Sequence, residues 1–180
     1  IDLAALLARN PARERGDTMA RTGLVILEED HASFVAVLEE LLEESNAKFV
    51  FLLDKNGQQI ARTGDLGDGD PTALASLTAG NVAATEGLAQ LIGETEFSTL
   101  FHEGERDSLH ISVILNKIIL LVIFDEHSSL GLVRLRVKQH CKQLAGVVDA
   151  VLTRDNGGSA GVTAAALGDI TDEDIDALFG

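Results

Sequence analysis

The chain has 180 residues, of which 46% are apolar, a size and composition that suit one folded domain with a hydrophobic core. Its formal net charge of −15 argues against nucleic-acid partners and direct membrane insertion, since phosphate-rich surfaces bind Lys and Arg side chains. The single cysteine, Cys141, excludes an internal disulfide, and the longest apolar run, residues 118–124, is shorter than the ~20 residues of a membrane span. We therefore expect a cytoplasmic protein.

Four segments are expected along the chain. Residues 1–23 are predicted to be an N-terminal extension that is disordered or in part not native, because the sole methionine, Met19, is where we expect natural translation to begin. Residues 24–154 are predicted to form the folded domain and residues 155–168 a glycine-rich flexible linker. Residues 169–180 are predicted to form an acidic segment that binds a partner.

The domain is predicted to begin with an amphipathic helix over 29–47, whose apolar residues recur every three or four positions. A run of strand-forming residues follows over 48–54, and Asn56-Gly57 predicts a tight hairpin turn into a second strand through Ile60. Asp70-Pro71 then marks the start of a second helix, with Asp70 as its cap and Pro71 at its first position.

This second helix, over 71–93, carries two different faces. A face of larger residues is expected to pack on the core of the domain: Leu74, Leu77, Ala84, Leu88, Leu91 and Ile92. A face of small residues is expected to be approached by another backbone, since Gly80 and Gly87 each cost a helix about 1 kcal/mol relative to alanine. That small-residue face consists of Ala75, Ala79, Val82, Ala83, Glu86 and Gly87.

Three further strands are predicted near 97–103, 108–115 and 118–124, followed by a long helix capped by Ser128 or Ser129. The order αββαβββα predicts an α/β (α+β) fold with a five-stranded antiparallel sheet. Three helices cover only part of the two faces of such a sheet, so we expect self-association.

No residue pattern predicts catalysis, and we expect no catalytic residue, metal site or cofactor. The five histidines lack the spacing of metal ligands, and the loop over 64–70 holds three aspartates but no lysine, unlike a phosphate-binding loop. On the last helix, Cys141 is expected in the core and His140 at the surface, because adjacent side chains on a helix diverge by about 100°.

Four cations cluster on this last helix of an otherwise acidic protein: Arg134, Arg136, Lys138 and Lys142. They form either a solvated face with internal ion pairs, or a contact surface for an acidic partner or for the acidic segment of the chain itself. The sequence leaves both alternatives open.

The closing stretch "DITDEDIDALFG" has the pattern of a short helix that becomes ordered on docking. Thr171 is expected to cap this helix, Asp174 completes a capping-box pattern, and Ile170 with Ile175 forms a hydrophobic staple. A helix this short is only marginally stable alone in water, so a partner is needed to order it. Its apolar side consists of Ile175, Leu178 and Phe179.

Five stretches together resemble the MglB family, bacterial Roadblock proteins of the mutual gliding motility polarity system. The resemblance is collinear from about Leu24 to Phe179. Its stretches are "NAKFVFLLDKNGQQI", "LASLTAGNVAATEGLAQLIGETEF", "FHEGERDSLHISV", "VIFDEHSSLGLVRLRVK" and "ITDEDIDALF".

The resemblance implies a Roadblock fold, a homodimer with a shared sheet and, as partner, a Ras-like small GTPase of MglA type. It implies that the protein is no enzyme itself but stimulates GTP hydrolysis by this partner, and also nucleotide exchange, without inserting an arginine finger. It implies a role in cell polarity and gliding motility, in the cytoplasm with enrichment at a cell pole. The implied GTPase-binding residues are Ala79, Val82, Ala83, Glu86, Gly87, Ile170, Asp174, Ile175, Leu178 and Phe179.

The alternative is a non-catalytic Roadblock scaffold that localises a GTPase complex without accelerating hydrolysis. Such a scaffold would bind the GTPase with any nucleotide, whereas an activator would prefer the GTP-bound form.

Overall fold

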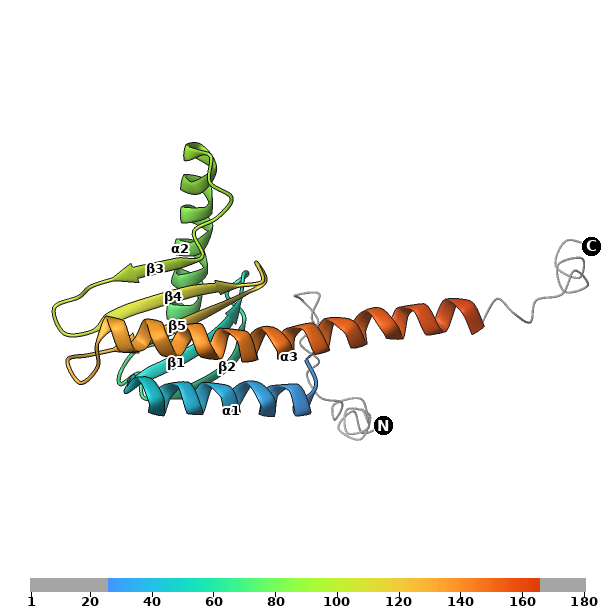
Figure 1. Cartoon of the computed structure of the whole chain (residues 1–180), viewed down its shortest axis with the longest axis horizontal. Helices are drawn as coiled ribbons and strands as arrows, with labels where there is room; N and C mark the ends of the chain where they lie inside the picture. Colours follow the sequence, from blue (N-terminus) through green and yellow to red (C-terminus); the bar gives the residue numbers. More distant parts are fainter. Residues whose placement is uncertain (1–25, 166–180) are drawn as a thin grey trace, which may run out of the picture.

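The structure, a computed structural model, describes residues 26–165 of the chain, with side chains described as far as Arg154. Within these residues, three helices flank one antiparallel sheet of five strands (Figure 1). The predicted order αββαβββα is confirmed. The elements are α1 (Glu28–Ser45), β1 (Phe49–Asp54), β2 (Gln59–Gly64), α2 (Pro71–Ile92), β3 (Thr99–His102), β4 (Ser108–Ile114), β5 (Ile118–Phe124) and α3 (Leu130–Ala165).

The strands lie in the order β2-β1-β5-β4-β3, so β1 and β5, which are distant in sequence, pair at the centre of the sheet. Every residue of β1 and β5 is buried, because helices cover both faces of the two central strands. Among the described strands, β3 lies at one edge of the sheet and pairs only with β4.

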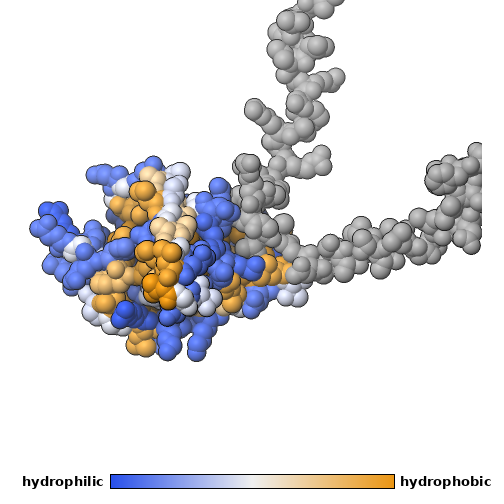
Figure 2. Space-filling model, turned by 90° about the horizontal axis from the view of Figure 1, so that it is seen from above, coloured by the Kyte–Doolittle hydropathy of each residue, from blue (hydrophilic) through white to orange (hydrophobic). Residues whose placement is uncertain are grey.

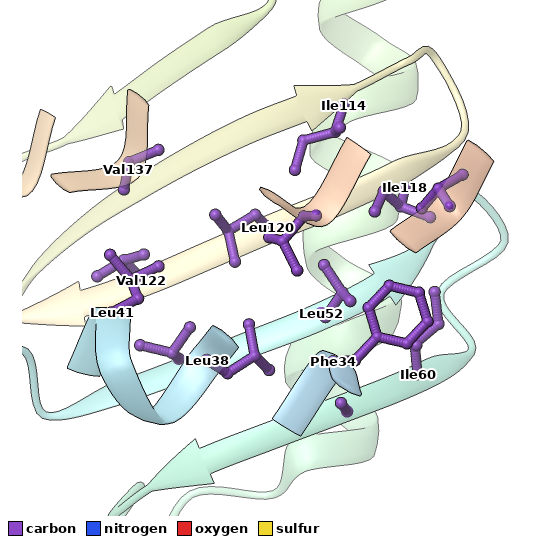
Figure 3. Close-up of a cluster of buried hydrophobic side chains, with 14 of the residues drawn as sticks. Phe34, Leu38, Leu41, Leu52, Ile60, Ile114, Ile118, Leu120, Val122 and Val137 are labelled. Carbon is purple, nitrogen blue, oxygen red and sulfur yellow. The ribbon is translucent and has the colours of Figure 1, made fainter. Parts of the chain in front are cut away.

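Alternating side chains divide the core into two layers. The larger layer lies between the sheet and helices α1 and α3, where Leu120 and Val122 of β5 pack against Phe34 and Leu38 of α1 (Figure 3). The smaller layer lies between the sheet and α2. Helix α3 contributes Val133, Val137, Leu144, Val148 and Val151 to the larger layer.

The ends of α1 are defined by local hydrogen bonds. The Asp30 carboxylate accepts a bond from the Leu27 backbone N–H at 2.8 Å, and Asn46 ends the helix in the left-handed conformation with a φ of 49°. Arg154 of α3 forms an ion pair with the same Asp30. Burial alone would raise the pKa of Asp30, but the bonds from Arg154 and Leu27 outweigh it and lower that pKa.

Helix α2 begins as predicted, with the Asp70 carboxylate accepting a hydrogen bond from the Thr72 N–H at 2.9 Å. The predicted orientation of α2 is wrong, however. Leu77 and Leu91 of the large-residue face are 73% and 83% exposed, and the helix packs on the sheet through small residues instead. These buried residues are Ala75, Thr78, Ala79, Val82 and Ala89.

Close approach explains this orientation. A Cβ added to Gly57, in the turn between β1 and β2, would lie 3.2 Å from the carbonyl oxygen of Ala75 and 3.4 Å from the Cβ of Ala79. Leucines on this face of α2 would hold the helix further from the sheet and leave a gap, so the small residues are the ones that pack.

Helix α3 begins as predicted, because the Ser129 hydroxyl accepts a hydrogen bond from the Leu132 N–H at 3.2 Å. Residues 155–168 were predicted to be a flexible linker, but in the structure α3 continues as a helix to Ala165. Alanines at 160, 164 and 165 favour the extension and the glycines at 157, 158 and 161 each oppose it by about 1 kcal/mol, but extending a helix that has already formed avoids the cost of nucleation. Residues 166–168, the predicted N-terminal extension over 1–23, residues 24 and 25, and the acidic segment over 169–180 lie outside the described residues.

Candidate partner-binding site

The outer face of α2 is the most prominent apolar surface of the described residues. It carries four of their seven exposed large apolar side chains: Leu77, Leu88, Leu91 and Ile92. Figure 2, which looks along α2 from its C-terminal end, shows hydrophobic surface bordered by hydrophilic side chains. Isolated exposed leucines are common, but a cluster on one helix is typical of an interaction surface.

The predicted GTPase-binding residues of α2 are divided between two environments. Ala79 and Val82 lie in the core, only 7% and 2% exposed, so these two predicted contact residues are not accessible to a partner. Ala83 and Gly87 are exposed and lie beside the leucines of the outer face. No described atom lies within 4 Å of where a Cβ on Gly87 would be, so packing among the described residues does not require a glycine there.

Glu86, the fifth predicted residue, is engaged within the chain. Its carboxylate pairs with Lys55, whose ammonium group also donates to Asn116 at 2.5 Å. Glu86 therefore ties α2 to the two turns at one end of the sheet. On the other side of the same helix, the Asn81 amide and the His102 ring lie 3.1 Å apart and join α2 to β3.

The remaining predicted contact residues lie outside the described part of the chain, so their binding role stays a prediction. They are Ile170, Asp174, Ile175, Leu178 and Phe179.

The four cations of α3 also lie in two different environments. Arg136 lies 3.2 Å from the carboxylate of Glu44 on α1, as expected for an internal ion pair. Arg134, Lys138 and Lys142 have no ion-pair partner among the described residues and line a groove instead.

The prediction that His140 lies at the surface is wrong, whereas Cys141, predicted in the core, packs against the larger core layer and is partly buried. His140 is only 3% exposed, and its Nδ1 lies 2.9 Å from the carbonyl oxygen of Arg136. Cys141 is half-buried at the groove, and burial raises the pKa of its thiol to about 11. His140 is buried where α3 packs against α1. The residue pattern of a single helix does not reveal a contact between two helices.

His110 of β4 is a buried histidine for which the sequence analysis predicted no role. Its side chain is only 2% exposed. The pairing of β4 with β5 places His110 opposite Val122, on the face covered by α3. The signal was present in "SLHISVI", where Ser108, His110 and Ser112 alternate with apolar residues and so share one face of the strand. Burial, together with the charge of Arg134, lowers the pKa of His110 to about 4.

This low pKa predicts a loss of stability in acid. The unfolded chain binds a proton at His110 below pH 6.5, but the folded chain does so only below about pH 4, so the free energy of unfolding should fall as pH drops from 6.5 towards 4. Urea denaturation at several pH values should show a smaller acid loss for His110→Gln than for the unchanged chain. His31→Gln, at an exposed position, is the matched control. Parallel pH curves for the unchanged chain and His110→Gln would contradict the assignment.

Two further features bear on the kind of site. No group of three or more His, Cys, Asp or Glu side chains within residues 26–154 is arranged to hold a metal ion. None of the described helices is both long and apolar enough to cross a membrane.

The Roadblock/LC7 domain matches residues 34–124. Myxococcus xanthus MglB is 50% identical, with a TM-score of 0.67, over 71% of this chain and 96% of that chain. The gliding protein MglB from Thermus thermophilus is 34% identical, with a TM-score of 0.68, over 72% and 98%.

A third structure, described as MglB with tetrameric arrangement, is 34% identical, with a TM-score of 0.69, over 73% of this chain and 99% of that chain. No match was found among curated protein sequences. The match to the domain, the strand order and these identities agree over nearly the whole length of the related chains. The chain therefore belongs to the Roadblock/LC7 family, within its MglB group.

Proposed function

We propose that this protein is a homodimeric regulator that stimulates GTP hydrolysis by a Ras-like small GTPase of MglA type, in the control of cell polarity and gliding motility. The observation that carries the proposal is the 50% identity to Myxococcus xanthus MglB over 96% of that chain. An effect on nucleotide exchange and enrichment at a cell pole belong to the same proposal. Catalysis in this scheme resides in the GTPase.

The chemistry of α2 supports an activator that donates no catalytic side chain. The helix contains no arginine or lysine, and Glu86 is its only charged residue. An arginine finger therefore cannot come from this helix. A surface of small residues such as Ala83 and Gly87 can instead let the switch loops of the GTPase lie close and hold their own catalytic groups in position.

Dimerisation is supported by two features on the same side of the molecule. The exposed leucines of α2 would be covered by the same residues of a second copy, as in an isologous interface. Strand β3 is an edge strand, so its outer backbone groups can pair with a second β3 and extend the sheet. The acidic segment from residue 169 onward would add a second contact with the GTPase.

Single-turnover GTP hydrolysis by the partner GTPase tests the proposal. We expect the full chain to increase the hydrolysis rate and to bind the GTP form more tightly than the GDP form. Deletion of residues 169–180 should leave the dimer folded and weaken its hold on the GTPase. An unchanged hydrolysis rate, together with equal affinity for both nucleotide forms, would favour the non-catalytic scaffold. Identical behaviour of intact and truncated chains would contradict the role of the acidic segment.

A further inference from the structure

A groove of about 540 Å³ lies between α3 and the β3–β4 edge of the sheet, away from α2. Val137 and Cys141 of α3 form part of its apolar lining, and Ser112 of β4 and Thr99 of β3 contribute hydroxyl groups. Arg134, Lys138 and Lys142 project from successive turns of α3 along it. The groove therefore combines apolar, hydroxyl and cationic surface.

The charge of this groove is exceptional for the protein. The chain contains 29 acidic and 14 basic residues, yet no aspartate or glutamate of the described part of the chain lines the groove. Its three cations have no ion pair within the described residues, whereas the neighbouring Arg136 is paired with Glu44. Uncompensated cations in an acidic protein attract an anionic ligand.

His110 supplies an independent sign of a ligand. It lies in the lining of the groove and is only 2% exposed, and its Nδ1 has no hydrogen-bond partner among the described side chains. A buried nitrogen without a partner is costly, and an anionic oxygen bound in the groove would satisfy it.

We propose that this groove binds the acidic segment over residues 169–176 of a second copy of the chain. The segment carries five acids and no cation: Asp169, Asp172, Glu173, Asp174 and Asp176. Its isoleucines, Ile170 and Ile175, would pack against the apolar part of the groove around Val137. Charge and apolar surface are thus complementary on both sides of the contact.

The length of α3 favours a second copy over the same chain. Helix α3 ends at Ala165, 23 residues beyond Lys142, which is about 35 Å along the helix axis. A chain that turns back from Ala165 fully extended covers about 37 Å by Asp176, so only the last acid reaches the level of Lys142. The five acids cannot face the three cations together within one chain, but they can in a neighbouring copy.

In this arrangement, a second copy of the chain would compete with any other partner for the acidic segment. This contact is separate from the proposed function, since neither the groove nor the segment requires a GTPase for it. The experiment below contains no GTPase, so its failure would leave the proposed activation untouched.

The test is fluorescence anisotropy with a fluorescein-labelled peptide of residues 169–179 titrated with the full chain. We expect saturable binding that weakens with salt and that falls about tenfold in the variant Lys138→Glu/Lys142→Glu. Lys117→Glu, an exposed cation outside the groove, is the matched control and should bind as the unchanged chain does. The variant Asp172→Lys/Asp174→Lys keeps its groove and loses its competing segment, so it should bind the peptide more tightly than the unchanged chain.

A second readout follows the His110 ring by NMR, since a bound carboxylate should raise the pKa of His110 from about 4. Equal peptide affinity for the Lys138→Glu/Lys142→Glu and Lys117→Glu variants would overturn the proposal. Movement of the His110 resonances with inorganic phosphate but not with the peptide would also overturn it, by showing a site for small anions.

Discussion

Replacement of Leu77 and Leu91 by glutamate is expected to convert the proposed dimer into monomers that remain folded. Both side chains are largely exposed in the single chain, so the fold of the monomer does not depend on them. In an isologous dimer each of these leucines is buried in both copies, and burial of a leucine contributes about 1.5–3 kcal/mol. Loss of four such side chains therefore costs at least about 6 kcal/mol, or roughly four powers of ten in the dimer dissociation constant.

Sedimentation equilibrium measures this change directly, and circular dichroism checks that the monomer stays folded. Leu135→Glu is the matched control, because Leu135 is an exposed leucine of α3, on the opposite face of the sheet. We expect this control to sediment as the unchanged chain does. A Leu77→Glu/Leu91→Glu variant that still forms dimers would show that the outer face of α2 is not the interface.

A charged side chain at Ala83 is expected to abolish stimulation of GTP hydrolysis while the dimer persists. Ala83 is exposed beside the leucines, and a glutamate there would hold the switch loops away and bring an uncompensated charge into the contact. Since a repositioned catalytic centre contributes several powers of ten in rate, the hydrolysis rate should return to that of the GTPase alone. Ala36→Glu, an exposed helical position on α1, serves as the control and should leave stimulation intact.

Replacement of Gly87 should affect the stability of the chain and its binding of the GTPase in opposite directions. Replacement by alanine should stabilise the isolated chain by up to about 1 kcal/mol, because Gly87 lies within a helix. Within residues 26–154, no other atom obstructs the added methyl group. The same methyl group should weaken the binding of the GTPase if a switch loop lies against the helix there. Urea denaturation and GTPase titration of Gly87→Ala measure the two effects. Stabilisation with unchanged GTPase affinity would move the contact away from Gly87.

The sequence by itself determined the elements whose signals are local. Asp70 caps α2 because its carboxylate reaches an N–H two residues away, and Asn46 ends α1 within its own backbone turn. A continuous apolar run such as 118–124 is typical of a strand covered on both faces, and β5 is buried at every position. These features depend on neighbours in sequence, so the chain order αββαβββα could be predicted in full.

Only the tertiary structure decided which face of α2 is buried. Both of its faces carry apolar residues, so periodicity alone does not rank them, and the short distance between α2 and the sheet selects Ala75, Ala79 and Val82. That selection removed two predicted contact residues from the surface and exposed the leucines. The groove at His110 likewise exists only because α3 crosses β4, bringing together side chains that lie more than 20 positions apart in the chain.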